Sequence, residues 1–253
     1  MAKPDSLLND LLIAFHLLSR LPLPAADWGS KTRPPARAAW AYPCVGLVTG
    51  AASALIAWSA LSLGIGAPVA AGLALASGIV ITGAMHEDGL ADCADGFWGG
   101  WEAARRLEIM KDSQIGTYGV LALVIVIGVK WMALSTILAT GSLWLLLIAP
   151  ILSRAAMVVV MERLAHARAS GLSKSTGKPG ARAMWLAMAL GAAAAFGLGL
   201  WSGLLLMGIA VCVTLCIMAL AKRKIGGQTG DVLGATQSCT DAALLVTLAA
   251  LAP

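Results

Sequence analysis

Charged residues are scarce in this 253-residue chain, where Lys, Arg, Asp and Glu together make up 12% of the sequence. Soluble globular proteins carry about 25% charged residues, so an ordinary soluble domain is excluded. Hydrophobic residues make up 59% of the chain, and the mean hydropathy is +0.83. Apolar runs of about 18 residues or more recur, which is the pattern of membrane-spanning helices. The sequence therefore predicts an integral membrane protein.

Three common motifs are missing as well. The five cysteines form no Cys-x-x-Cys pair, and an odd number without zinc-type spacing argues against a disulfide framework or a zinc site. The apolar stretch from Leu7 to Leu21 is interrupted by polar residues and is followed by no small-residue cleavage site, so it does not read as a secretory signal. We expect it to form an amphipathic helix on the membrane surface. No Walker A loop is present.

The apolar runs divide the chain into seven candidate spans. Short polar or Gly-containing links between several of them indicate helical hairpins. The predicted fold is therefore an all-α, polytopic transmembrane helical bundle of about seven spans, with the N-terminal amphipathic helix beside it and residues 1–253 forming one domain. The candidate spans are residues 40–63, 68–85, 119–139, 143–161, 184–201, 203–221 and 240–252.

The basic residues predict the orientation of this bundle. Of the 18 Lys and Arg residues, 16 fall on one side of the predicted map, and the other two, Lys130 and Arg154, lie inside spans. Basic residues mark the cytoplasmic side, so the active face is expected there. We expect Lys130 to snorkel to the far interface. Asp241 is expected at the start of the last span, apart from the other carboxylates.

Four carboxylates fall within nine residues at the end of an apolar run. On a helix, Asp88, Asp92 and Asp95 occupy positions i, i+4 and i+7 and share one face, while Glu87 points elsewhere. Like charges this close repel unless a cation lies between them. Hard oxygen ligands favour Mg²⁺, which in turn favours phosphate chemistry. The pattern predicts a metal site, with a solvated acidic helix end as the alternative; for His86, a structural and a ligand role both stay open.

A basic segment follows the acidic one. Arg105, Arg106 and Lys111 are predicted to bind a diphosphate, because an Arg guanidinium can form bidentate hydrogen bonds to phosphate oxygens. Asp112, directly after them, is a further candidate metal ligand. The alternative for the cations is the ordinary excess of positive charge on the cytoplasmic side.

A glycine-rich loop follows the last cluster of cations. Such loops expose backbone N–H groups that hold phosphate. Lys224, Gln228 and Thr229 are therefore candidate substrate ligands, and Asp231 is a candidate metal ligand or general base; a plain loop is the alternative. Arg154 lies about two turns inside a span, where an unpaired charge is costly. It is predicted to face the bundle interior and an anionic partner, such as substrate phosphate or the acidic cluster.

These segments form three motifs in chain order, and the chain resembles the cobalamin (5′-phosphate) synthase family in all three. The short N-terminal patterns around Ser19-Arg20-Leu21-Pro22 and Tyr42-Pro43, and the pair Ser153-Arg154, fit the same family. The resemblance covers nearly the whole chain. The motifs are His86-x-Asp88-Gly-Leu-Ala-Asp92-x-x-Asp95-Gly, Arg106-Leu-Glu-Ile-Met-Lys-Asp112-Ser-x-x-Gly116-Thr-x-Gly119 and Gly226-Gly-Gln-Thr-Gly-Asp231-x-Leu-Gly-Ala235.

The resemblance implies a reaction. Enzymes of this family join adenosylcobinamide-GDP to α-ribazole or α-ribazole 5′-phosphate, release GMP and use Mg²⁺ at the bacterial inner membrane. It implies catalytic roles for Asp88, Asp92 and Asp231, with Asp95 and Asp112 completing the metal-ligand set; which of them acts as a base stays open. Other late enzymes of cobalamin synthesis are candidate partners, no nucleic acid is expected, and the oligomeric state stays open.

Two rival functions share parts of this pattern. A CDP-alcohol phosphotransferase of phospholipid synthesis has a similar acidic motif, but Ala91 is followed here by Asp92 where that family has Arg. A cation transporter would place Asp88 and Asp92 near the membrane midplane, not beside cations at one interface. Three departures from the resembled family, at Glu87, Ser238 and residues 170–180, concern substrate contacts.

Overall fold

The described part of the chain is built from helices. The computed structural model describes residues 7–28 and 34–252, and in this part of the chain the only bridge between extended residues joins His166 to Gln228. The elements are α1 (Leu7–Leu18), η1 (Pro35–Ala41), α2 (Tyr42–Ser62), α3 (Ala67–Thr82), α4 (Met85–Gly99), α5 (Ala103–Ile109), α6 (Thr117–Ala139), η2 (Leu143–Leu147), α7 (Ile148–Arg163), α8 (Leu172–Thr176), α9 (Ala181–Phe196), α10 (Leu200–Ile225) and α11 (Gly230–Leu251).

Five helices in the described residues are long and apolar enough to cross a membrane, so the chain is a multi-pass membrane protein. The number becomes six when the bent pair α3–α4 counts as one span, and α9 is a shorter apolar helix. The expectation of about seven spans is roughly consistent with this arrangement. The five spans are Pro35–Ser62, Thr117–Ala139, Leu143–Arg163, Leu200–Ile225 and Gly230–Leu251.

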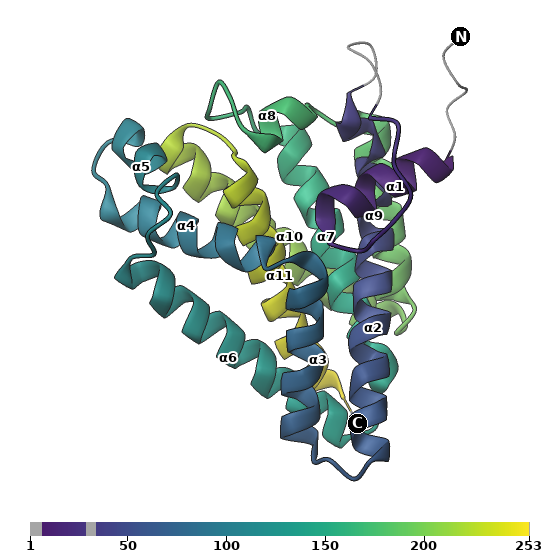
Figure 1. The fold of residues 1–253 in the computed structure, drawn as a ribbon. Coiled ribbons are helices and arrows are strands. Elements are labelled where there is room, and N and C mark those ends of the chain that lie inside the picture. Colours follow the sequence, from purple (N-terminus) through teal and green to yellow (C-terminus); the bar gives the residue numbers. More distant parts are fainter. Residues whose placement is uncertain (1–6, 29–33, 253) are drawn as a thin grey trace.

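The chain turns sharply between α3 and α4. The two helices make an angle of 87°, and both Gly83 (φ 66°) and Ala84 (φ 58°) adopt the left-handed conformation at the break. Because Ala84 has a side chain, this conformation is costly there and is kept by the surrounding packing. As a result α4 runs across one end of the bundle instead of continuing the span, and α1, α5 and α8 lie at the same end (Figure 1).

The last helix begins earlier than predicted. We expected a span over 240–252, but α11 starts at Gly230, because the Thr229 side chain accepts a hydrogen bond from the Val232 N–H and caps the helix. Asp241 therefore lies in the middle of a helix, so its predicted place at a helix start is wrong. Buried polar residues such as Gln237 and Asp241 lower the hydropathy of the first half of this helix, which is why its start was missed.

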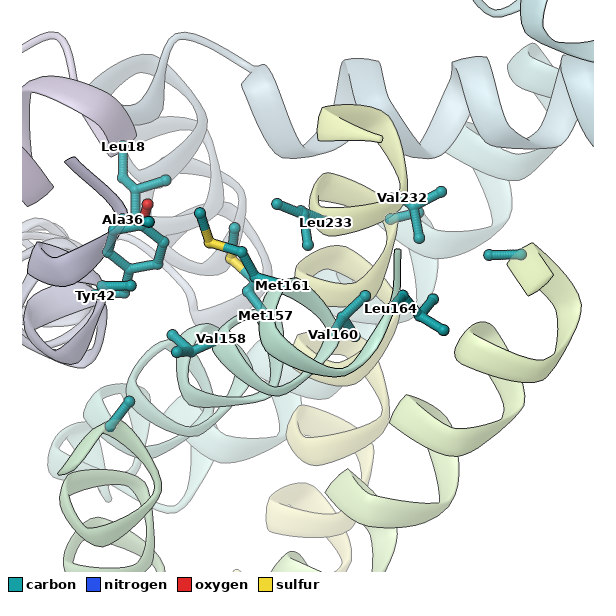
Figure 2. Close-up of a cluster of buried hydrophobic side chains, with 14 of the residues drawn as sticks. Leu18, Ala36, Tyr42, Met157, Val158, Val160, Met161, Leu164, Val232 and Leu233 are labelled. Carbon is teal, nitrogen blue, oxygen red and sulfur yellow. The ribbon is translucent and has the colours of Figure 1, made fainter. Parts of the chain in front are cut away.

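Close packing between α2 and α7 depends on small residues. A Cβ at Gly46 would collide with the Pro150 carbonyl, and one at Gly50 would lie 2.8 Å from the Leu146 carbonyl oxygen. Glycine at these two positions of α2 therefore allows close contact with the span Leu143–Arg163. Nearer the end that carries α4, buried Met157 and Met161 from α7 lie close to Tyr42 of α2 and form one wall of a cavity (Figure 2).

Candidate functional site

Two glycines bring the first and third motifs together. A Cβ at Gly89 on α4 would lie 2.7 Å from the Asp231 carbonyl oxygen and 3.2 Å from the Gly234 Cα on α11. The two backbones therefore touch where the helices cross. This crossing places Asp88 and Asp92, one turn apart on α4, beside Asp231 in the first turn of α11.

The three carboxylates at this crossing interact electrostatically. Asp92 lies on α4, outside the five spanning helices, and its pKa is raised from 3.8 to about 7, first by burial and then by the negative charges of Asp231 and Asp88. Within the described residues, the carboxylates of Asp88 and Asp92 make no hydrogen bond and no ion pair. Their oxygens are thus available to a ligand, and the site favours a cation.

Arg168 lies next to these acids and was missed by the sequence analysis. Its Nη1 donates to Asp231 Oδ2 at 3.1 Å, and its Nη2 donates to the Leu107 carbonyl at 3.1 Å. It also counteracts the rise in the pKa of Asp92. In the sequence it is one Arg in a polar loop, and the excess of positive charge on one side of the membrane explained it fully. Only the docking of that loop shows its partner.

The glycine-rich loop is docked against the loop after α7. The Gln228 N–H donates to the Ala165 carbonyl at 2.8 Å, and the Ala167 N–H donates to the Gln228 carbonyl at 2.9 Å. A Cβ at Gly227 would collide with the Ala165 carbonyl oxygen. Glycine is needed here for contact between two backbones, and the role of the loop in binding phosphate stays a prediction. Thr229 donates to Asp231 Oδ2 at 3.1 Å and helps to orient that carboxylate.

A buried polar network adjoins this docked loop. The Ser173 hydroxyl donates to Gln228 Oε1 at 2.7 Å, and Gln228 Nε2 lies 2.9 Å from His166 Nδ1. The predicted candidates Gln228 and Thr229 are both buried, at 1% and 3% exposure, and are bonded to protein groups. Both nevertheless line the same cavity as Asp88 and Asp231.

A cavity of about 250 Å³ opens between α4, α7, α11 and the 166–176 segment. Asp88, Asp231 and Arg168 lie on its polar side, and Tyr42, Met157 and other apolar side chains lie on another side. Of the five predicted acids, Asp88 and Asp231 reach the wall of this cavity. The full lining consists of Leu17, Leu18, Tyr42, Met85, His86, Asp88, Met157, Met161, His166, Arg168, Ser170, Gly171, Leu172, Ser173, Lys174, Thr176, Gln228, Thr229, Gly230, Asp231, Leu233 and Gly234.

Asp95 has a different task from the other acids on α4. Its Oδ2 accepts a hydrogen bond from the Gly116 N–H at 2.7 Å, and its Oδ1 accepts one from the Gly119 N–H at 2.9 Å. A Cβ at either glycine would collide with this carboxylate. Asp95 therefore holds the N-terminus of α6, where unpaired N–H groups and the helix dipole favour a negative charge. Its role as a metal ligand stays a prediction.

The structure does not bring Asp112 to the cavity. Its exposed side chain accepts a hydrogen bond from the Gln114 N–H at 3.1 Å, and it is absent from the cavity wall. Its predicted metal role has no support from a neighbouring carboxylate.

Two of the predicted substrate-binding cations, Arg106 and Lys224, donate hydrogen bonds to backbone carbonyls of neighbouring segments. Arg106 donates to the Gly100 and Lys224 carbonyls, both at 2.9 Å. Lys224 donates to the Phe97 carbonyl at 2.9 Å and lies 5.4 Å from the centre of the Trp98 ring. Exposed Arg105 pairs with Glu108, and exposed Lys111 lies outside the cavity wall, as do the other three cations. These contacts fasten α5 to α4 and α10.

A second polar cluster lies deeper in the bundle. Lys130 is 3% exposed, and its Nζ lies 3.1 Å from Asp241 Oδ2, 3.8 Å from Glu87 Oε1 and 3.3 Å from Ser238 Oγ. The expectation that Lys130 snorkels to the far interface is therefore wrong, because two carboxylates inside the bundle bind it. Glu87 points away from the acidic face, as predicted.

Arg154 belongs to this second cluster. It is buried, donates to the Pro150 carbonyl at 3.1 Å, and lines a cavity of about 70 Å³ with Glu87 and Asp241. It faces the interior, as predicted, and the carboxylates that share its cavity are those of Glu87 and Asp241, whereas Asp88 and Asp231 line the larger cavity. Buried His86 lines both cavities, and neither of its ring nitrogens has a hydrogen-bond partner among the described residues. Both of its proposed roles stay open.

Two of the acids match the oxygen ligands that Mg²⁺ prefers. Among the described residues, no group of three or more His, Cys, Asp or Glu side chains is arranged to hold a metal ion. Mg²⁺, however, is usually held by one or two carboxylates together with waters and substrate phosphates. Unpaired Asp88 and neighbouring Asp231 at the cavity wall supply such a pair, with Asp92 beside them. A closed metal site made by Asp88, Asp92 and Asp95 alone is not formed.

The chain is similar to known proteins over nearly its full length. The sequence model of a family described as "Cobalamin-5-phosphate synthase" matches residues 10–249. A protein of Bradyrhizobium diazoefficiens is 42% identical over 97% of this chain and 95% of its own length. Another, from Azorhizobium caulinodans, is 42% identical over 95% of each chain. Both are named adenosylcobinamide-GDP ribazoletransferase. No solved structure matches the chain.

Proposed function

This chain belongs to the cobalamin-5-phosphate synthase family, and we propose that the cavity between α4, α7 and α11 is where it performs its transfer reaction. It is a transferase of cobalamin synthesis, whose substrates are adenosylcobinamide-GDP and ribazole. The observation that carries the site assignment is that Asp88 and Asp231, from motifs 143 positions apart in the sequence, share one cavity with Arg168.

The proposed reaction is one displacement at phosphorus. A ribazole hydroxyl oxygen of the acceptor, which is α-ribazole or α-ribazole 5′-phosphate, forms a bond to the phosphorus that carries the corrinoid. The bond from this phosphorus to the oxygen bridging it to GMP breaks, and GMP leaves with that oxygen. The hydroxyl proton passes to a carboxylate of the site or to water. The products are adenosylcobalamin, or its 5′-phosphate, and GMP.

The residues of the cavity suit the charges of this reaction. Asp88 and Asp231 are the proposed ligands of Mg²⁺. Asp92, which interacts electrostatically with both, is a further candidate ligand or proton acceptor. Bound Mg²⁺ would offset the negative charge of the diphosphate. Arg168, held by Asp231 and the Leu107 carbonyl, is placed to contact a phosphate oxygen. The roles proposed for Arg105, Arg106, Lys111 and Lys224 are better filled by Arg168.

The proposed location is the bacterial inner membrane, with the cavity facing the cytoplasm. Apart from Lys130 and Arg154, 16 of the 18 basic residues fall in segments predicted at one side, and this distribution marks the cytoplasmic side. Helix α4, which follows the sharp turn after α3, and the short helices α5 and α8 lie together at one end of the bundle (Figure 1). Water-soluble nucleotide would reach the site there. Other late enzymes of the pathway remain candidate partners.

The test is product formation by the purified protein. Protein in detergent is mixed with Mg²⁺, adenosylcobinamide-GDP and α-ribazole 5′-phosphate, and corrinoid product and GMP are separated by chromatography. We expect equal amounts of the two from the native chain and neither from Asp88→Ala. Absence of product from folded native protein would overturn the proposal. Assays with CDP-alcohols and ion-flux assays would then test the two rival functions.

A further inference from the structure

The proposed reaction uses only part of the cavity wall. Asp88, Asp231 and Arg168 account for the diphosphate, but the segment 166–176 adds a second group of polar side chains to the same cavity. Its second half overlaps residues 170–180, one of the departures from the resembled family. Its side chains at the wall include His166, Lys174 and three hydroxyl residues.

The hydrogen bonds of His166 define which of its ring nitrogens carries the proton. The Ser173 hydroxyl donates to Gln228 Oε1 at 2.7 Å, which fixes the orientation of the Gln228 amide. Gln228 Nε2 then donates to His166 Nδ1 at 2.9 Å. Nδ1 is therefore an acceptor, and in the neutral ring Nε2 carries the proton. In the described part of the chain Nε2 has no hydrogen-bond partner, so it is a free donor at the cavity wall.

Two lysines flank this histidine, and only one of them lines the cavity. Lys174 directly follows Ser173, whose hydroxyl oxygen lies 3.2 Å from His166 Nδ1. The pKa of His166 is lowered from 6.5 by burial and then by the charges of Lys174 and Lys178. Lys178 Nζ donates to the Glu162 carbonyl at 3.0 Å and is absent from the cavity wall. Lys174 lines the cavity and, within residues 7–28 and 34–252, has neither an ion pair nor a hydrogen bond from its side chain.

A neutral N–H donor beside a cation is suited to an anion, and the apolar part of the same cavity lining is suited to a flat ring. Leu18, Tyr42, Met157 and Met161 supply this wall (Figure 2). Of the two substrates, the ribazole acceptor combines a flat aromatic base with a ribose. When it is phosphorylated, its phosphate is a second anion separate from the diphosphate. The matching family is described by a product that carries such a phosphate.

We propose that His166 Nε2–H and the Lys174 ammonium bind the 5′-phosphate of the acceptor, and that they make the enzyme prefer α-ribazole 5′-phosphate over α-ribazole. This inference rests on the proposed function. His166 and Lys174 select the acceptor and take no part in the displacement. Gln228 and Ser173 are positioning residues, because they hold His166 in the tautomer that can donate.

Binding without turnover tests this assignment. Isothermal titration of the detergent-solubilised protein with α-ribazole and with α-ribazole 5′-phosphate is carried out without the corrinoid substrate, so no reaction occurs. We expect the native chain to bind the phosphorylated acceptor at least about tenfold more tightly, the effect of one or two charge-assisted hydrogen bonds. Lys174→Met is expected to remove most of this preference. Lys178→Met, the matched loss of a nearby positive charge, is expected to keep it.

A pair of histidine variants separates the donor from the ring. In His166→Gln the side-chain amide reaches the position of Nε2 and can still donate, whereas in His166→Asn it reaches only the position of Nδ1. We expect the first to retain most of the preference and the second to lose it. Equal affinity of the native chain for the two acceptors, or equal loss in both lysine variants, would overturn the assignment. These results are independent of turnover, so failure of this subsite is distinguished from failure of the transferase assay.

Discussion

Gly89 on α4 and Gly234 on α11 touch through their backbones, and a Cβ added to Gly234 would lie 3.3 Å from the Gly89 Cα. At Gly89 an added Cβ would meet the Asp231 Cα at 3.0 Å. This contact is the geometric reason that Asp88, Asp92 and Asp231 form one cluster. Any side chain at the crossing pushes the two acidic motifs apart.

Gly89→Ala is therefore expected to lower both stability and activity. Overpacking of this kind costs about 1–3 kcal/mol of stability. The shift of α4 also moves the acids, so turnover should fall by more than the loss of stability alone would cause. Gly128→Ala on α6 is the control, because no atom lies within 4 Å of its added Cβ. That variant should be at least as stable as the native chain. Thermal unfolding in detergent and the product assay measure the two effects; equal behaviour of both variants would contradict the crossing.

The raised pKa of Asp92 predicts a pH dependence of stability in the absence of divalent ions. The pKa is about 7 in the fold against 3.8 for the free group, so the folded state binds the proton more tightly than the unfolded state. Stability from this group is present below pH 4 and is lost as the pH rises through 7. In EDTA, the melting temperature of the native chain should fall over this window. Asp92→Asn should flatten the slope and be the more stable protein at pH 8.

Mg²⁺ should reverse part of that loss. An ion that binds the folded acids stabilises the protein according to its concentration relative to its dissociation constant, by about 2.7 kcal/mol at a hundredfold excess. We expect the melting temperature to rise with Mg²⁺ at pH 8, and to rise much less in Asp88→Ala and Asp231→Ala. Addition of the same concentration of NaCl controls for ionic strength. An equal rise in all three proteins would show that the ion binds elsewhere.

Lys130 should be needed for stability. Its removal takes from Glu87 and Asp241 the cation with which they form ion pairs inside the bundle, and breaking a buried ion pair costs about 3–5 kcal/mol. Lys130→Met is expected to unfold at a much lower temperature, and Lys130→Arg to recover part of the difference. Lys111→Met, which removes an exposed positive charge, should change stability by no more than about 0.5 kcal/mol. Similar melting temperatures for Lys130→Met and Lys111→Met would contradict the ion pairs.

Hydropathy predicted the membrane bundle because a spanning helix is largely a matter of composition and length. It missed the true start of α11, because residues such as Gln237 and Asp241 lower the hydropathy of a helix whose polar side faces other protein. The turn after α3 depends on Ala84 in a left-handed conformation, and Ala gives no sequence signal for that.

The candidate site was predictable in the same uneven way. Helical spacing correctly placed Asp88 and Asp92 on one face, and the motif order indicated Asp231. Arg168 and His166 could not be predicted, because their roles arise from the docking of one loop on another, between residues 60 or more positions apart. Spacing also grouped Asp95 with the metal ligands. In the structure, however, Asp95 lies further along α4, where this face contacts the N-terminus of α6.

Asp95 and Asp112 were both predicted as metal ligands, and their substitution distinguishes a structural role from none. Asp95→Ala removes the acceptor of two N–H groups at the start of α6, which should cost about 2–3 kcal/mol, since bonds to a charged group are the stronger ones. Asp112→Ala, at an exposed site, should change neither stability nor turnover appreciably. Asp95→Asn, which retains one acceptor oxygen, should recover part of the stability and of the activity. If either Ala variant instead abolished turnover at full stability, with activity restored by higher Mg²⁺, that carboxylate would be a metal ligand after all.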